Sequence, residues 1–515
     1  MSTEQHHIIR KQFLHVEVDG SESVGMALQR SFPLLCQNML MPALERMLNR
    51  IVPAEEHWLI DRLDIDAGML DLENLERDLT AAVTQALEKQ LREQIPPAGA
   101  TPLSNAVQRH TESQSVHEAL LYFLNTGSLP WWFHLPAGST LEQVVQASWQ
   151  TARAPDYFER NMVDALSSVT VQTRLAQQFS AEFLATLLEK LAPQHAAAVQ
   201  EIFATLGDAA FTIGTWWRQF STHIWQTAFA HATTGRLPTA STLVTECWQT
   251  LPDATRQQPA LAARMQQHWP EALHAPAAST HHRFQESAAS HDAAHVTAGI
   301  IKPTHSETVT PKGNSQHRDD AHSEIPRVTT ETTKPAQDIA RTKTSERLNL
   351  KQGVYVNNAG LVLLHPFLPQ FFTSLGIAAD HRLLQPQRAL GLLHYLATGQ
   401  HVAPEYALLL PKLLCHIPFA TPVESRIELT TTEAAEADAL LNAVIQHWTA
   451  LRDTSADGLR GTFLLRPGKL SQRDDGDYTL QVEAQSFDLL LDQLPWGIGI
   501  IKLPWMDTML WVEWR

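Results

Sequence analysis

Cysteine, basic residues and long apolar runs are all scarce in this sequence of 515 residues. Its three cysteines, Cys36, Cys247 and Cys415, lie far apart and cannot all pair, which excludes a disulfide scaffold and favours a reducing compartment. Lys and Arg number 39 against 55 for Asp and Glu, a net charge of −16, which argues against a nucleic-acid-binding protein. No apolar run approaches the roughly 18–20 residues of a membrane span, and the polar N-terminus does not resemble a signal peptide. A protein of this kind that leaves a cell is expected to do so inside something else.

Apolar residues are plentiful outside one long segment. The chain is 44% hydrophobic, which is enough for several buried cores. Residues 273–350, however, are rich in Ser, Thr, His, Ala and Pro and contain only one aromatic residue, Phe284. Such a segment buries too little apolar surface to offset a backbone entropy of roughly 1–2 kcal/mol per residue. We therefore predict a disordered linker over 273–350.

Hydrophobic periodicity predicts an α+β fold, predominantly α-helical, on both sides of this linker. The N-terminal region is expected to be a small β-α-β-α unit that ends at Pro96-Pro97, with strands over 7–19 and 58–65 and helices over 23–50 and 72–91. Pro33 and Pro42 are expected to kink or divide the first helix. The predicted domains are an N-terminal unit over 1–97, a helical domain over 98–272, the linker over 273–350 and a C-terminal α+β domain over 351–515.

The helical middle and the C-terminal region have different patterns. In the middle, apolar residues recur at helical spacing, and the expected helices span 114–126, 140–150, 157–178, 180–192, 195–206, 209–231 and 240–250. The C-terminal region is expected to begin with helices and to end in two β-hairpins separated by a helix. The hairpins would pair 463–465 with 478–483 and 497–502 with 509–514, and the helix would span 487–494.

Motifs of catalysis and cofactor binding are missing. The chain has no G-x-G-x-x-G, P-loop, H-E-x-x-H, C-x-x-C or G-x-S-x-G. Asp64 and Asp66 would share one face of the second strand and could hold a divalent cation, but a solvated strand face is the simpler interpretation. The acidic run at 474–477 is better explained as a hairpin turn, and the eight histidines within 274–322 lack the fixed geometry of a metal site. We therefore predict no enzyme, no cofactor and no metal.

Tryptophan next to proline is the most distinctive local feature. Three segments place Trp directly after a Leu-Pro pair, at 129–132, 494–496 and 503–505. Proline fixes the backbone while the indole buries a large area, so core packing is the favoured interpretation. The alternative is an anchor at a protein interface, where Trp is enriched, and the last hairpin also offers an edge for strand addition. The candidate interface residues are Trp131, Trp132, Trp496, Trp505 and Trp511.

Short segments near both ends of the chain carry a family resemblance. The most specific is YVNNAGLVLLHPF at 355–367. It is followed in order by RALGLLHYLATG at 388–399, PEY at 404–406, LLC at 413–415, HW at 447–448, TS at 454–455, GLR at 458–460, FLLR at 463–466, GKL at 468–470 and LPWGIGIIKLPWM at 494–506. HHIIRKQ at 6–12, LDIDAG at 63–68 and FLNTGSLPWW at 123–132 precede it. Together these segments resemble the tape measure proteins of contractile injection systems, the phage-tail-like particles related to antifeeding prophages and virulence cassettes.

The resemblance implies a non-enzymatic structural protein that governs inner-tube assembly and length. Its partners would be tube, baseplate and spike proteins, with a homo-oligomer within the tube as a further option and no nucleic acid or membrane span involved. It would be cytoplasmic during assembly and then lie within the particle. The folded ends would engage tube or baseplate subunits while the linker, at most about 250 Å long when extended, sets their separation.

Two other functions remain open from the sequence. One is an assembly chaperone or cargo-loading adaptor for tube or toxin subunits, which would be absent from the finished particle. The other is an enzyme, such as a hydrolase that uses the acidic cluster at 61–66. A fully helical ruler of this length would span about 770 Å, yet the sequence lacks the long heptad pattern of an extended coil.

Overall fold

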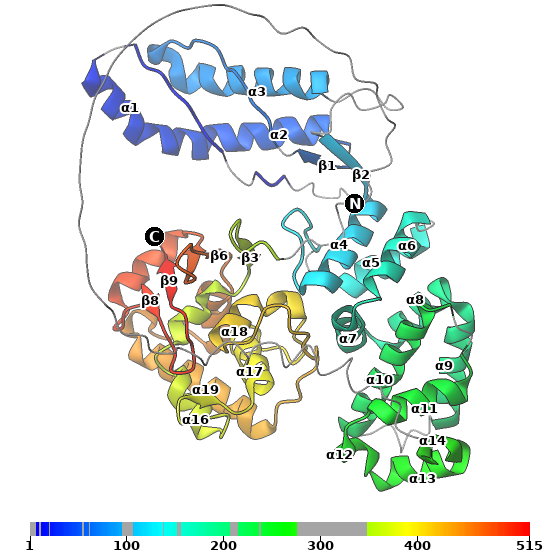
Figure 1. The fold of residues 1–515 in the computed structure, drawn as a ribbon. Helices are drawn as coiled ribbons and strands as arrows, with labels where there is room; N and C mark the ends of the chain where they lie inside the picture. Colours follow the sequence, from blue (N-terminus) through cyan, green and yellow to red (C-terminus); the bar gives the residue numbers. More distant parts are fainter. Residues whose placement is uncertain are drawn as a thin grey trace, which may run out of the picture.

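Three separate apolar cores organise the chain (Figure 1). The computed structural model describes residues 7–9, 12–19, 21–53, 56–60, 62–94, 107–136, 138–151, 156–206, 215–235, 238–274 and 348–514. Within these ranges the fold is α+β and predominantly helical, as predicted. The predicted linker lies outside the described residues except at its two ends. None of the helices in the described ranges has both the length and the apolar character that a membrane crossing requires.

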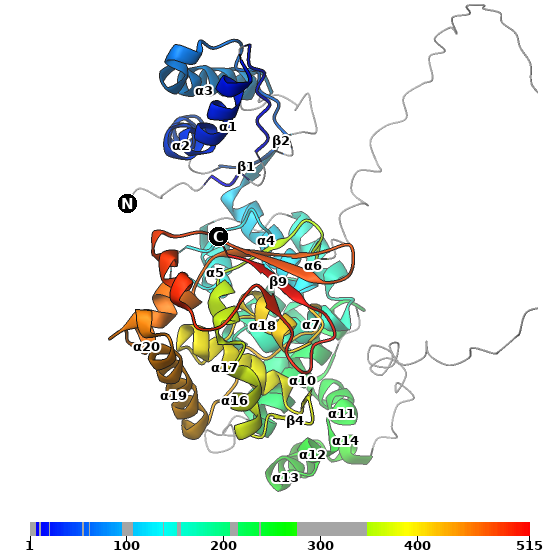
Figure 2. The ribbon, with the colours of Figure 1, turned by 90° about the vertical axis from the view of Figure 1, so that its left-hand side faces the viewer.

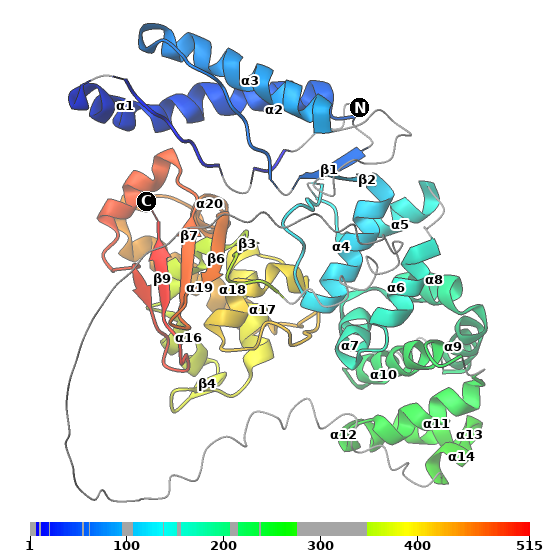
Figure 3. The same cartoon turned by 45° about the horizontal axis from the view of Figure 1, so that its top comes forward.

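The N-terminal part (7–111) combines three helices with a two-stranded sheet. The elements are α1 (Glu22–Leu35), α2 (Met41–Ile51), β1 (Glu56–Ile60), α3 (Leu75–Gln94) and β2 (Val107–Thr111). Pro33 lies inside α1 and Pro42 in the first turn of α2, and a π-helical turn, Cys36–Leu40, separates the two helices. The expected division of the first helical stripe is therefore confirmed. Figures 1, 2 and 3 all place α1–α3 apart from the rest of the chain, with β1 and β2 between them and α4.

The predicted strands of this part are corrected in two ways. Residues 7–9 and 12–19 form no strand in the described chain, and Phe13 is 88% exposed, so the apolar alternation there has no surface to pack against. Strand β1 ends at Ile60 instead of continuing to residue 65, because its antiparallel partner β2 is only five residues long. The β-α-β-α order is thus replaced by α-α-β-α-β, and the sheet reaches beyond Pro96-Pro97.

The helical part (112–274) follows β2 directly. Its helices are α4 (Glu112–Thr126), α5 (Leu141–Thr151), α6 (Asp156–Ala165), α7 (Val169–Gln178), α8 (Ala181–Leu191), α9 (Pro193–Leu206), α10 (Thr215–Ala232), α11 (Ala240–Thr250), α12 (Asp253–Arg256), α13 (Pro259–His268) and α14 (Pro270–His274). The single helix predicted over 157–178 is divided, because Ser167 bonds back to the Asp164 carbonyl and Ser168 becomes the N-cap of α7. The other predicted helices are confirmed within a few residues wherever the structure describes them.

The C-terminal part (348–514) packs helices against a five-stranded sheet of order β3-β6-β7-β9-β8. Its main helices are α16 (Leu368–Ser374), α17 (Pro386–Thr398), α18 (Leu409–Leu414), α19 (Thr431–His447) and α20 (Ala456–Leu459). The strands are β3 (Val354–Val356), β6 (Gly468–Gln472), β7 (Tyr478–Val482), β8 (Ile500–Ile501) and β9 (Leu510–Glu513), beside a small hairpin of β4 (Ala378–Ala379) and β5 (Arg382–Leu383). Figure 2 shows this sheet in front of the helices.

The second predicted C-terminal hairpin is present, whereas the first has a different first strand. Strands β6 and β7 pair antiparallel, as do β8 and β9. The first hairpin begins later than predicted, since the stretch expected at 463–465 lies at the end of a π-helical turn, Arg460–Leu464. The helix expected at 487–494 is a 3-10 helix, Ser486–Gln493. A parallel pairing of β7 with β9 merges the two hairpins into one sheet, which the sequence did not predict.

Candidate interaction site

A buried cluster of three charged side chains joins the helical part to the C-terminal part. We call Arg174, Glu405 and Lys412 the junction cluster, and each of these side chains is 0% exposed. Arg174 Nε donates to Glu405 Oε2 at 2.9 Å, and Lys412 Nζ donates to Glu405 Oε1 at 2.6 Å. Arg174 comes from α7, whereas Glu405 and Lys412 lie more than 200 residues later in the sequence. A single carboxylate therefore bridges two cations that belong to different parts of the fold.

Backbone carbonyls also accept hydrogen bonds from both cations. The Arg174 guanidinium also donates to the carbonyls of Leu124 and Ala420. The Lys412 ammonium donates to the Phe419 carbonyl at 2.9 Å and the Thr421 carbonyl at 2.7 Å, which with Glu405 uses its three protons. Burial lowers the pKa of Lys412, and the neighbouring Glu405 carboxylate opposes this effect. Two cations and one carboxylate give the cluster a net charge of +1. The four carbonyl dipoles stabilise this extra positive charge, so no ion is buried without a partner.

The Glu405 carboxylate lies close to Gly127, where no side chain occupies the space. Gly127 caps the C-terminus of α4 with a left-handed backbone, φ 77°, a conformation that glycine usually supplies at helix C-termini. A Cβ at this position would overlap the Glu405 carboxylate and come within 3.2 Å of Arg174 Nη2. Because the FLNTG segment ends its helix with a glycine, the Glu405 carboxylate can approach Arg174 without a clash.

Further hydrogen bonds cross the junction around this cluster. Gln178 accepts from the Glu405 backbone N–H at 2.8 Å and donates to the Val423 carbonyl at 2.7 Å. The Gln177 carbonyl accepts from both the backbone N–H and the hydroxyl of Ser425. At the solvent-exposed edge, Arg218 of α10 pairs with Glu428, whose side chain is 70% exposed. The C-terminal half of α7 is thus hydrogen-bonded to the segment at 404–428.

One aromatic side chain provides an apolar contact at the junction. The ring of Tyr406 meets Phe123 edge to face, with centroids 5.8 Å apart, and packs against the core of the helical part. Its hydroxyl is hydrogen-bonded to the backbone of Leu141, and burial raises its pKa. Tyr406 follows Glu405 directly, so one short 3-10 helix, Glu405–Ala407, supplies both the bridging carboxylate and the inserted ring.

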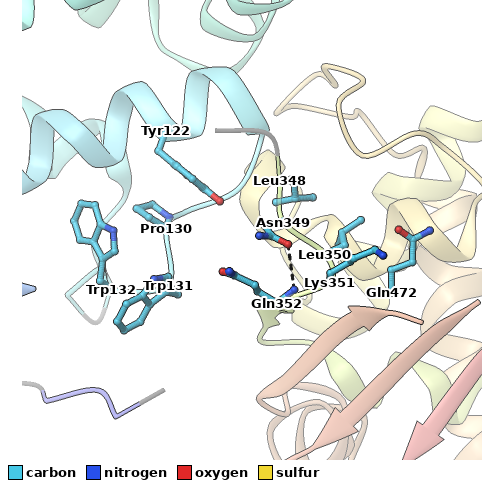
Figure 4. A pocket seen from close by; sticks show the side chains of 10 residues that line it. All are labelled: Tyr122, Pro130, Trp131, Trp132, Leu348, Asn349, Leu350, Lys351, Gln352 and Gln472. Atoms are coloured by element: carbon cyan, nitrogen blue, oxygen red, sulfur yellow. Dashed lines mark hydrogen bonds between the residues drawn. The ribbon is translucent and has the colours of Figure 1, made fainter. Parts of the chain in front are cut away.

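Two of the candidate tryptophans border a groove at the same junction. Trp131 and Trp132 are half-buried, and with Tyr122 and Pro130 they face residues 348–352 and Gln472 across a space of about 680 Å³ (Figure 4). Figure 4 shows that one wall comes from α4 and the loop after it, and the other from the chain that leads into β3. Leu348, a residue near the end of the predicted linker and the first that the structure describes after 275–347, therefore faces the Leu-Pro-Trp-Trp corner.

The other three candidate tryptophans are half-buried in the C-terminal part. Trp496 Nε1 donates to the Leu363 carbonyl at 3.0 Å, and Trp505 Nε1 donates to the Leu414 carbonyl at 2.7 Å. The Trp511 indole N–H points to Asp477 Oδ2 at 3.4 Å, and the Arg473 guanidinium lies over its ring. These contacts favour the core interpretation, while the half-exposed rings leave part of each surface available to a partner.

The acidic pairs considered for a metal are solvated loops. Asp64 accepts from Arg62 Nε and is 77% exposed, and Asp66 accepts from the Gly68 backbone N–H. Neither residue lies in a strand, so the shared strand face that was predicted for them is wrong. The run at 474–477 forms the turn between β6 and β7, as expected. No group of three or more metal-ligating side chains occurs in the described ranges, and most of the histidines within 274–322 lie outside them.

The junction cluster is the site that sequence reasoning missed. Its signal was a single cation in apolar surroundings, because Lys412 stands between Leu409-Leu410-Pro411 and Leu413-Leu414 in α18. A lysine so placed needs an ionic partner if the helix is buried. Only the tertiary structure reveals that this partner is Glu405 and that Arg174 shares it.

Comparison with known proteins identifies a family for the chain. A family described as contractile injection system tape measure protein matches residues 6–514, which spans all three parts of the chain. Curated proteins and solved structures give no significant match. Three of the segments that carried the resemblance, at 123–132, 404–406 and 413–415, contribute to the junction or lie directly beside it.

Proposed function

We propose a role in inner-tube assembly for this chain, which belongs to the contractile injection system tape measure protein family. The family match over 6–514 is the observation that carries the proposal, because it includes every part of the fold. In this role the chain is structural and not catalytic, and it governs where polymerisation of the tube stops. It works in the cytoplasm during assembly and lies within the particle afterwards, with tube, baseplate and spike proteins as its partners.

Half-exposed tryptophans are the anchors that we propose for these partners. Trp131 and Trp132 are the first to test, because they border a groove that a side chain of another protein can enter. Trp496, Trp505 and Trp511 form the second set, since they are half-buried within the C-terminal part. An anchor variant such as Trp131→Ala should reduce the yield of particles without lowering the unfolding temperature of the isolated protein. If particles form normally, the ring has only a packing role.

Tube length measured by electron microscopy tests length control. The segment 275–347 should be shortened and lengthened in steps while the described parts stay unchanged. A proportional change in tube length would support a ruler whose variable part is this segment. Unchanged length would reject a ruler based on the segment, and loss of all particles would indicate a role in starting the tube instead.

Recovery of the chain with particles tests whether it persists in them. A tape measure protein should be found in purified, complete tubes at a fixed ratio to tube subunits. Its absence from complete tubes, together with its presence in assembly intermediates, would contradict the ruler and identify a transient assembly factor.

A further inference from the structure

We propose that the helical and C-terminal parts are complementary halves that bind each other without the covalent connection between them. The partner surface for residues 112–274 is thus the surface of residues 348–514 around the junction cluster. This inference goes beyond the role in tube assembly, because it concerns the isolated chain. It predicts that a chain cut within 275–347 stays together as a specific complex.

Each half has an apolar core of its own. The buried core of the helical part draws only on residues between Val116 and Ala272, and that of the C-terminal part only on residues between Val356 and Trp514. Among the described apolar side chains of the C-terminal part, only that of Tyr406 packs against the helical core. Cutting the connection therefore leaves each core intact, and the contact between the halves is an interface and not a shared core.

Arg174 of the helical half has its ionic partner, Glu405, in the C-terminal half. The helical half presents Arg174, and the C-terminal half presents Glu405, which Lys412 already neutralises from its own side. Binding buries Arg174 against Glu405 and the Ala420 carbonyl, so its charge finds both an ionic and a dipolar partner. A wrong partner that lacked the carboxylate would leave the Arg174 guanidinium buried without a counter-ion, which strongly lowers the stability of a complex. The cluster therefore gives the contact its specificity.

Backbone groups fix the register of the two halves. The Glu405 N–H and the Val423 carbonyl bind opposite ends of the Gln178 amide, and the Ser425 N–H binds the Gln177 carbonyl at 3.3 Å. These bonds join consecutive residues of α7 to a segment of about twenty residues in the other half. A shift of either surface by one residue breaks all three bonds together, which favours a single mode of docking.

The reach of the chain depends on this contact. While the junction is closed, the separation of the two halves is set by the interface, whatever the length of segment 275–347. A segment of 73 residues spans up to about 250 Å only after the halves have parted. The junction is thus the element that must open before the segment can measure a distance in the proposed ruler.

A cleavage experiment tests the inference in solution. The recognition sequence of a site-specific protease is inserted within 275–347 of the full chain, and the cut protein is analysed by gel filtration and analytical ultracentrifugation. We expect the two fragments to sediment as one complex at micromolar concentration, and to bind with a Kd below about 1 µM. Separate sedimentation of two folded fragments would overturn the inference, whatever the protein does in particles.

Two matched variants locate the source of binding. Glu405→Gln keeps the shape of the side chain but removes the charge, so we expect at least about 100-fold weaker binding of the cut fragments. Arg218→Ala removes the partly exposed ion pairs with Glu424 and Glu428 at the edge of the same interface and should weaken binding by less than about tenfold. Equal effects of the two substitutions would overturn the role of the cluster.

Folding of the fragments is checked by circular dichroism in each case. If Glu405→Gln prevents the C-terminal half from folding, Gln178→Ala serves instead, because it changes only the helical half and removes two hydrogen bonds across the junction. We expect about tenfold weaker binding for this variant, the effect of one to two neutral hydrogen bonds. Unchanged affinity would show that the halves do not meet through α7.

Discussion

The N-terminal and C-terminal parts are attached to the helical part in opposite ways. Strand β2 runs into α4 without a break, so the N-terminal part is the nearest neighbour in sequence. Yet its apolar core consists of six buried residues in the described chain, against 43 in the C-terminal part. The C-terminal part, which lies beyond a connection of 73 residues, meets α7 through buried ions and backbone hydrogen bonds. Continuity of the chain therefore does not decide which parts form one body.

Exposure of apolar side chains shows the same contrast. Twelve of the 21 exposed large apolar side chains in the described residues lie between Ile8 and Leu72. Helix α1 has no buried residue at all. A unit with so small a core has little stability of its own, and we expect it to unfold before the rest of the chain in a separate transition. Four predictions test this contrast, beginning with the largest effect.

Trp448→Ala should lower the stability of the C-terminal part by about 3–5 kcal/mol. The Trp448 side chain is fully buried, its Nε1 donates to the Leu490 carbonyl at 3.2 Å, and its ring lies 4.7 Å from that of Phe463. Urea unfolding followed by tryptophan fluorescence and circular dichroism measures the loss. Trp511→Ala, at a half-buried position of the same part, is the control and should cost much less. If the N-terminal transition shifts equally, the parts are not independent.

Gly127→Ala should cost about 2–4 kcal/mol, whereas Gly138→Ala should cost about 1 kcal/mol. Both glycines have φ of 77°, but only at Gly127 would a Cβ collide with Glu405, since nothing lies within 4 Å of the same position at Gly138. The difference between the two variants, measured by thermal or urea unfolding, isolates the tight approach at the junction. Equal losses would mean that Glu405 moves away freely and that the junction is loose.

Acid should destabilise the two large parts between about pH 6.5 and pH 4. Burial lowers the pKa of His117 in α4 and of His394 in α17 to about 4. In this range the unfolded chain binds protons that the folded chain excludes, so the free energy of unfolding falls as the pH falls, by roughly 2–3 kcal/mol per histidine. Neutral His117 also accepts from Trp149 Nε1 at 3.1 Å, a bond lost on protonation. Urea unfolding at several pH values measures the slope.

His117→Gln is the variant that checks this assignment. It should weaken the pH dependence of the free energy of unfolding, since glutamine does not titrate but retains an acceptor for the indole. A slope identical to that of the unchanged chain would assign the acid sensitivity to other groups.

Phe13→Ser should change the stability of the N-terminal part by no more than about 0.5 kcal/mol. The ring is 88% exposed and therefore loses almost no contact when it is removed. The first transition in urea is the measurement. A loss above about 1 kcal/mol that grows with protein concentration would show that this surface is covered by another molecule, and the contrast between the two parts would then reflect a missing partner.

Much of the fold was predictable because the local sequence patterns favour the same helices and strands that pack in the tertiary structure. The helices of the middle part follow from apolar spacing, and Thr111 with Gln114 starts α4 through a capping box. The second C-terminal hairpin was visible as apolar runs around a turn, whereas the first strand of the other hairpin, β6, is not an apolar run and was missed. The strand predicted over 7–19 failed because alternation alone does not supply a neighbouring strand, and the true partner of β1 follows a helix and a proline pair.

The junction was beyond local reasoning for a different reason. Arg174, Glu405 and Lys412 are each ordinary in their own segments, and their pairing depends on how two cores dock across more than 200 residues. The Leu-Pro-Trp corners were recognised as rigid, but the pattern of residues does not tell which face of an indole meets its own core. Gly127 belongs to the FLNTGSLPWW segment at 123–132, and only the position of Glu405 explains why this turn leaves no room for a side chain.

The order of strands in the C-terminal sheet has a consequence for how the protein is made. Strand β9 lies between β7 and β8, so it is an interior strand although it is the last of the five in sequence. A ribosome releases β3, β6 and β7 well before residues 510–513, and until then one edge of β7 has no partner. The sheet is thus completed only when its last strand is made, and the unpaired edge of β7 is exposed to other nascent chains until Leu510–Glu513 emerges.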